Sequence, residues 1–178
     1  MFLAVCLLAS LASVAVMGGR LDALADLRFR EPWLLGLAFG LQILVISVAP
    51  AGDAWWHQAL HLASYGLGGA FVVRNRQVPF LWLIGAGGLM NLAAIAANGG
   101  VMPARPAALA AAGLMAGPGF ANSAPLAHPR LAFLGDVFAI PDAVPLANVF
   151  SVGDICIAVG ALLLLHRVCG ARRLRAAR

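Results

Sequence analysis

"NVFSVGDICIAVG", residues 148–160, places a single aspartate, Asp154, near the start of an otherwise apolar helical run. The run continues to residue 166 and ends at Arg167, so its length suits a transmembrane helix. A carboxylate is costly in lipid, and an ionisable residue in such a position is a functional-site hypothesis by default. Asp154 is therefore the first candidate site residue, and the rest of the chain decides its surroundings.

The composition is far more apolar than that of a typical soluble domain. Hydrophobic residues make up 62% of the 178 residues and charged residues 11%, whereas soluble domains carry roughly 25% charged residues. The pattern predicts an all-α, multipass integral membrane protein with a single domain and about five transmembrane helices. The apolar runs extend over residues 1–18, 33–49, 57–73, 78–97 and 148–166, with approximate bounds.

The basic residues predict an orientation. All 12 are arginines, and most lie directly beside an apolar run, at residues 20–30, 74–76 and 167–178. By the positive-inside rule, this favours the cell inner membrane, with the N-terminus outside and the C-terminus in the cytoplasm. Membrane lipids are then the expected partners. Nucleic acid is not expected, because a phosphate-binding face would need arginines free of lipid.

A long segment separates the fourth and fifth runs. Residues 98–147 hold seven of the ten prolines, a density that excludes one long helix and predicts an extracytoplasmic loop. Within it, "AALAAAGLMA" at 107–116 is too short to span a bilayer. It is expected to be either a re-entrant or an interfacial helix.

Small residues and asparagines share one face of the fourth run. Gly87, Asn91, Ala94 and Asn98 follow helical spacing. Small residues allow close helix packing, and a buried asparagine seeks a partner across the contact. We expect a helix-packing stripe, with the wall of a site as the alternative.

Asp53, His57 and His61 follow one another at intervals of four residues, at the start of the third run. Two histidines and a carboxylate can bind a metal. On one straight helix, however, the three side chains extend over about 12 Å, too far for a single ion. The sequence therefore predicts interfacial polar anchors, with no metal and no cofactor.

The second candidate carboxylate is Asp136 in "FLGDVF". We expect Asp136 to fold back and face Asp154 within about 5 Å, so that the pair shares a proton. One member would activate a water and the other would polarise a carbonyl, with Asn91, Asn98 and Asn148 as supporting hydrogen-bonding residues. The alternative is that Asp154 caps the last helix while Asp136 lies in an unrelated turn.

Four stretches together resemble a bacterial membrane-protein family known as domain of unknown function 5317. They occur in the order expected for the family and cover most of the chain. The resemblance implies an integral membrane protein and brings no known activity with it. The stretches are "GRLDALADLRFR", "NLAAIAANGGVMP", "FLGDVFAIP" and "NVFSVGDICIAVG".

A more local likeness is to lipoprotein signal peptidases, which are membrane aspartyl proteases. "NVFSVGDICIAVG" is similar to the box that opens their last helix, and "LGDVF" to the stretch around their first catalytic aspartate. The likeness implies catalytic roles for Asp136 and Asp154. Another signature box of these proteases is absent, Gly153 replaces an alanine, and the helix count differs.

The sequence favours a binding, scaffold or accessory membrane component that acts with an unknown membrane-protein or lipid-linked partner. The alternative is an intramembrane aspartyl hydrolase that uses Asp136 and Asp154. A small transporter is a third reading, which the absence of an internal repeat disfavours.

Overall fold

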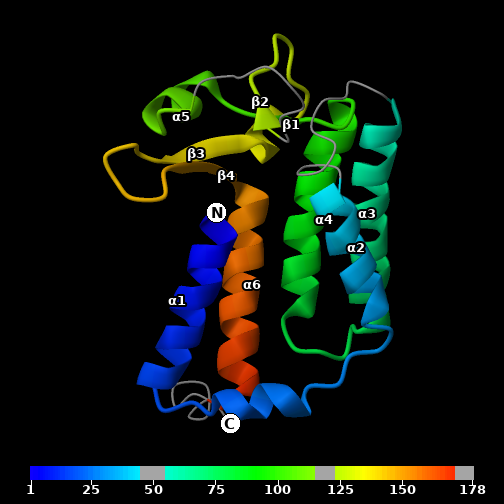
Figure 1. The fold of residues 1–178 in the computed structure, drawn as a ribbon, viewed down its shortest axis with the longest axis vertical. Coiled ribbons are helices and arrows are strands. Elements are labelled where there is room, and N and C mark those ends of the chain that lie inside the picture. The colour runs from blue at the N-terminus through cyan, green and yellow to red at the C-terminus, as the bar shows by residue number, and fades with distance from the viewer. Residues whose placement is uncertain (45–54, 115–122, 171–178) are drawn as a thin grey trace.

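The computed structural model describes residues 1–44, 55–114 and 123–170. Its longer helices run side by side, and short strands with one small helix form a cap across one end (Figure 1). Neighbouring helices pack in the order α1, α6, α4, α3, α2. The long helices are α1 (Phe2–Val16), α2 (Trp33–Ile43), α3 (Trp55–Arg74), α4 (Leu81–Ala97) and α6 (Val152–Val168).

The cap contains two strand pairs, so the all-α prediction is wrong. β1 (Met102–Pro103) pairs in parallel with β2 (Ser123–Ala124), and β3 (Asp136–Ile140) pairs antiparallel with β4 (Asn148–Ser151). A bridge between Ala104 and Asp136 joins the two pairs. The cap also holds α5 (Pro106–Ala111) and the 3-10 helix η3 (Ala132–Leu134).

Glycines allow α4 and α6 to approach closely. A Cβ added at Gly87 would collide with the Gly153 carbonyl, and one added at Gly160 would lie 2.8 Å from Ile84 Cγ1. This confirms a close helix contact on the face of α4 that holds Gly87 and Asn91. The contact fixes the first turn of α6, which carries Asp154, against α4.

Aliphatic and aromatic side chains fill the rest of the helix contacts. Leu34, Phe71 and Leu164 belong to a core cluster that joins α2, α3 and α6. Val14 of α1 packs against α6, and there Ser13 Oγ lies 2.8 Å from the buried His166 Nε2. The core therefore runs between the helices, below the cap.

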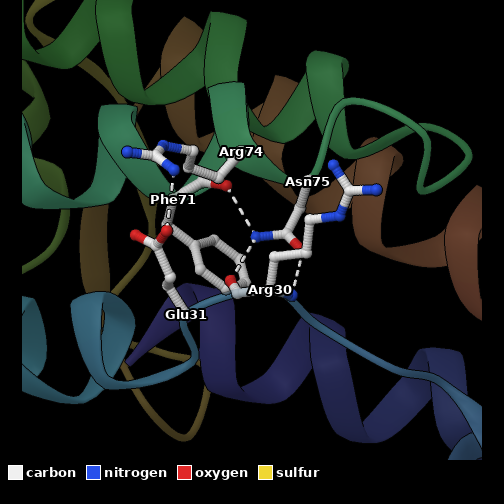
Figure 2. Close-up of polar contacts among 5 residues, drawn as sticks. All are labelled: Arg30, Glu31, Phe71, Arg74 and Asn75. Atoms are coloured by element: carbon white, nitrogen blue, oxygen red, sulfur yellow. Dashed lines mark hydrogen bonds and ion pairs between the residues drawn. The ribbon is translucent and has the colours of Figure 1, made fainter.

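At the end opposite the cap, a buried asparagine ties the turn after α3 to the linker before α2. The Arg30 amide donates to Asn75 Oδ1 at 2.7 Å, and Asn75 Nδ2 donates to the carbonyls of Arg30 and Phe71 at 2.9 Å each. Figure 2 shows these contacts beside the Arg74–Glu31 ion pair of 2.7 Å. The 3-10 helix η1 (Leu21–Asp26) precedes this linker.

The predicted multipass membrane topology is wrong. Among residues 1–44, 55–114 and 123–170, no helix combines the length and the apolar character needed to cross a membrane. α1, α2, α4 and α6 contain 15, 11, 17 and 17 residues, whereas a span needs about 20. α3 has 20 residues but includes polar positions such as His61, Ser64 and Arg74. The predicted inner-membrane localisation, with an outside N-terminus and a cytoplasmic C-terminus, is overturned by the same finding.

The apolar runs overestimated the helices because a run of apolar residues does not mark where a helix begins. The fifth run was expected to be helical from residue 148, but Asn148–Ser151 form β4 and α6 begins at Val152. In the Pro-rich segment, α5 has six residues rather than the ten proposed for 107–116. Residues 115 and 116 lie outside the described residues.

A candidate ligand-binding cleft

The functional candidate is a cleft of about 1090 Å³ that lies among α2, α3, α4, α6 and the cap. Asp136 and Asp154 both line it, as does Asn148 of β4. Apolar side chains from the helices form most of the remaining wall. They include Leu35 and Phe39 of α2, Phe71 and Val72 of α3, Leu81, Ile84 and Leu92 of α4, and Ile157 and Leu164 of α6.

Asp154 stabilises the start of α6 through a capping box. Ser151 is the N-cap residue, and its Oγ accepts from the Asp154 amide at 3.0 Å. Asp154 Oδ2 in turn accepts from the Ser151 amide at 3.0 Å. The two bonds satisfy amide groups that would otherwise lack partners in the first turn. The sequence-based alternative is confirmed only in part. Asp154 caps the last helix, but from the third helical position with Ser151 as the N-cap, and Asp136 begins β3 rather than lying in an unrelated turn.

Asn91 links the same aspartate to α4. Its Nδ2 donates to Asp154 Oδ1 at 3.0 Å, and its Oδ1 accepts from Ser151 Oγ at 2.8 Å. Ser151 is fully buried and Asn91 almost so. Asn91 therefore orients the carboxylate as well as packing the helices together, which joins the two roles that the sequence left as alternatives.

Asp136 is held at the start of β3. Its carbonyl accepts from the Arg105 amide at 2.9 Å, and Ser123 Oγ donates to Asp136 Oδ2 at 2.6 Å. Gly135 precedes it, and a Cβ there would collide with the Pro103 carbonyl. The small residue before the aspartate thus lets β3 lie directly against β1.

Burial is the main cause of an altered acidity at Asp136. The side chain is only 7% exposed. Burial raises the pKa of Asp136 to about 6; the Ser123 hydrogen bond opposes this shift, and the nearby charge of Asp154 adds to it. A buried carboxyl keeps its proton longer because desolvation penalises the charged form.

The structure brings the two aspartates to one end of the cleft. Asp136 lies opposite Ser151 in the β3–β4 pair. Ser151 is three residues before Asp154 in the chain. Each carboxyl is hydrogen-bonded to its own partners, Ser123 for Asp136 and Asn91 with the Ser151 amide for Asp154. The chain does fold back so that Asp136 and Asp154 face a common cleft. Direct sharing of a proton between them stays a prediction.

Tyr65 of α3 is a site residue that sequence reasoning missed. It lines the cleft, and its pKa is raised to about 12 by burial and by the charges of Asp154 and Asp136. His61 is 1% exposed and packs edge-on against the Tyr65 ring, with centroids 5.4 Å apart. A tyrosine four residues after a histidine in an apolar run was the available signal, because the two lie on one helical face.

The predicted supporting asparagines divide between two places. Asn148 lines the cleft, whereas Asn98 binds the cap backbone: its Oδ1 accepts from the Arg130 amide at 2.8 Å, and its Nδ2 donates to the Arg130 carbonyl at 2.7 Å. Asn98 therefore does not support the aspartates directly. Ser123 and Ser151 take that role instead.

Of the histidine and aspartate series in the third run, the structure describes only the side chain of His61. Asp53 lies outside the described residues, and so does the side chain of His57. His61 is buried rather than interfacial. Over the parts of the chain that the structure describes, no group of three or more His, Cys, Asp or Glu residues is arranged to hold a metal ion.

Replacing Asn91 with leucine should lower the free energy of unfolding by about 2 kcal/mol, because the buried Ser151 hydroxyl and Asp154 Oδ1 each lose a partner. Urea denaturation followed by circular dichroism measures this change. Leu89→Ala, at an exposed position of the same helix, is the control and should change stability little. An unchanged stability in Asn91→Leu would mean that these bonds contribute nothing to folding.

Comparison with known protein families gives a match. A model described as "Family of unknown function (DUF5317)" matches residues 26–166. The chain therefore belongs to this family, as the four sequence stretches indicated. No curated protein and no solved structure shows a significant match. The local likeness to lipoprotein signal peptidases is not shown by these comparisons.

Proposed function

We propose that this DUF5317 protein is a binding protein for an amphiphilic molecule, with a cationic or hydrogen-bond-donating head group at Asp136 and Asp154. The hydrocarbon part would extend between the helices. Single-chain lipids and lipid-linked groups are molecules of this class. The observation that carries the proposal is one large cleft that contains both carboxyl groups and has mainly apolar side chains from four helices along its wall.

The cleft extends well beyond its two carboxyl groups. The carboxyl groups of Asp136 and Asp154 lie where the cap meets the first turn of α6. Leu164, ten residues beyond Asp154 on α6, is still part of the wall, a distance of about 15 Å along the helix axis. Clefts that bind small molecules are mostly apolar, with a few polar groups that fix orientation.

The charge of the lining selects the head group. Two aspartates line the cleft, and no arginine, lysine or histidine of the described residues does so. A cation or a neutral donor gains charge-assisted hydrogen bonds to the carboxylates. An anionic head group would meet like charges in a poorly hydrated place, which is unfavourable.

A second candidate function is hydrolysis by the two aspartates. The observation that favours it is the raised pKa of Asp136, about 6, in a cleft that also contains Asp154. A carboxyl with a pKa near 6 exchanges its proton close to neutral pH, which suits general acid chemistry, while its neighbour activates a water. The test is to incubate the protein with a lipid-modified peptide and to detect the cleaved peptide fragment by mass spectrometry. Asp136→Asn should abolish the release.

Calorimetric titration of the purified chain at pH 7.5 tests the binding proposal with three probes of equal chain length. Dodecylamine should bind more tightly than dodecanol, and dodecanoate should bind most weakly. Asp136→Asn should weaken dodecylamine binding about tenfold, the worth of one charge-assisted hydrogen bond. Asp154→Asn should act in the same direction.

Asp26→Asn is the matched control, because Asp26 is exposed in η1 and does not line the cleft. It should leave dodecylamine binding unchanged. Equal affinity for dodecylamine and dodecanoate, or an Asp136→Asn variant that binds the amine as well as the parent chain, would overturn the proposal. Circular dichroism of each variant confirms that it is folded.

A further inference from the structure

A second, smaller pocket of about 280 Å³ lies in the cap; it shares Leu126 with the cleft, but neither aspartate lines it. Its wall is almost entirely apolar and contains a single charged residue, Arg105. The apolar residues include Pro103, Pro106, Leu126, Pro129 and Phe133. A pocket of this size fits a compact small molecule rather than a long chain.

The pocket walls are fixed by the backbone. Three of the lining residues are prolines, whose rings restrict the main chain. Asn98 binds both the amide and the carbonyl of Arg130, beside Pro129. Asn98 thereby anchors the segment that leads to Phe133. A wall that is ordered before binding lowers the entropic cost of association.

The main chain of Arg105 is fixed by a hydrogen bond, whereas its side chain can bind a ligand. Its amide donates to the Asp136 carbonyl at 2.9 Å. The side chain is exposed, and it makes no hydrogen bond or ion pair with the residues that the structure describes. A guanidinium stays charged at all accessible pH values and presents paired donors that match a carboxylate.

We propose that this pocket is a binding site for a small carboxylic acid with a compact apolar body. The Arg105 guanidinium would pair with the carboxylate, and the proline and phenylalanine walls would contact the apolar part. A single cation among apolar walls suits a monoanion; a dianionic phosphate ester would leave charge unpaired. The site takes a ligand of opposite charge to that of the cleft, so the two proposals can be tested separately.

Titration of the ¹⁵N-labelled chain with benzoate, followed by two-dimensional NMR, tests this site directly. Benzoate should produce saturable shifts at the amides of Arg105, Phe133 and Val137. Benzyl alcohol, which has a similar shape but no charge, should bind about tenfold more weakly, as should benzoate to Arg105→Gln. Arg130→Gln is the control, because Arg130 is also in the cap but does not line the pocket.

Asn98→Ala provides a second, independent variant. It should weaken benzoate binding through the Arg130 segment while the shifts at Arg105 remain detectable. The proposal fails if benzoate gives no saturable shifts, if benzyl alcohol binds equally well, or if Arg105→Gln binds benzoate as the parent chain does. Asp136→Asn should not change benzoate binding, so a failure here is distinguishable from a failure of the cleft proposal.

Discussion

Asn75→Ala should lower the free energy of unfolding by about 3 kcal/mol, because the substitution removes three hydrogen bonds from a fully buried side chain. The amide and carbonyl of Arg30 would both lose their partners. The Phe71 carbonyl keeps a bond to the Asn75 amide at 3.0 Å, so most of the effect arises at the linker. Urea denaturation measured by circular dichroism gives the change directly.

The matched control is Gln77→Ala, which alters an exposed amide side chain in the same turn. It should change stability by less than about 0.5 kcal/mol. If Asn75→Ala were equally mild, the contacts shown in Figure 2 would not hold the α3–α4 turn to the linker before α2. The ion pair of Arg74 with Glu31 is exposed and would then be the remaining link, and exposed pairs contribute little.

Local patterns predicted the helical parts of the fold more closely than they predicted the cap. α4 occupies Leu81–Ala97 within the expected run of 78–97, and the small-residue face was correctly expected to pack. The β3–β4 pair was missed because Val149 and Phe150 continue an apolar run directly into α6. Short apolar segments do not distinguish a strand from a helix by periodicity alone.

The membrane prediction failed for a related reason. Hydropathy reports how apolar a stretch is, whereas a span also depends on where the backbone leaves the helix. The capping box at Ser151 and Asp154 begins α6 after the start of the apolar run. The sequence contained this signal, a serine three residues before an acidic residue, which is a variant of the capping-box pattern.

The candidate site was predicted in part. Asp136 and Asp154 were selected because carboxylates are unusual among apolar neighbours, and the structure places both in one cleft. Ser123 and Tyr65 were not selected, because serine and tyrosine are ordinary in such stretches and their approach depends on contacts between distant segments. Asn98 was assigned to the wrong place for the same reason: its partner, Arg130, lies 32 residues away.

Asp136→Asn should raise the free energy of unfolding at pH 7.5 while it weakens binding of a cationic amphiphile. The folded chain raises the pKa of Asp136 from 3.8 to about 6. Between these two values the folded state holds a proton that the unfolded state has released. The contribution of Asp136 to stability is therefore most favourable below about pH 4, becomes less favourable as the pH rises to about 6, and stays at that lower level above it. The shift corresponds to on the order of 3 kcal/mol at neutral pH.

Urea denaturation at pH 4, 5, 6 and 7.5 isolates this effect when the variant is compared with the parent chain. The stability gain of Asp136→Asn should be largest at pH 7.5 and should vanish near pH 4, where Asp136 is protonated. Asp142→Asn, at an exposed position between β3 and β4, should give no such difference. A gain that is independent of pH would show that the aspartate is not protonated on folding.

Binding and stability should then respond to pH in opposite directions. Below pH 6 the neutral Asp136 relieves its burial cost, so the fold gains stability, but it no longer offers a full charge to a cationic head group. Dodecylamine affinity should fall over the same interval in which stability rises, and Asp136→Asn should remove both dependences together. A buried carboxylate that destabilises the fold at neutral pH is the pattern expected of a residue kept for binding rather than for folding.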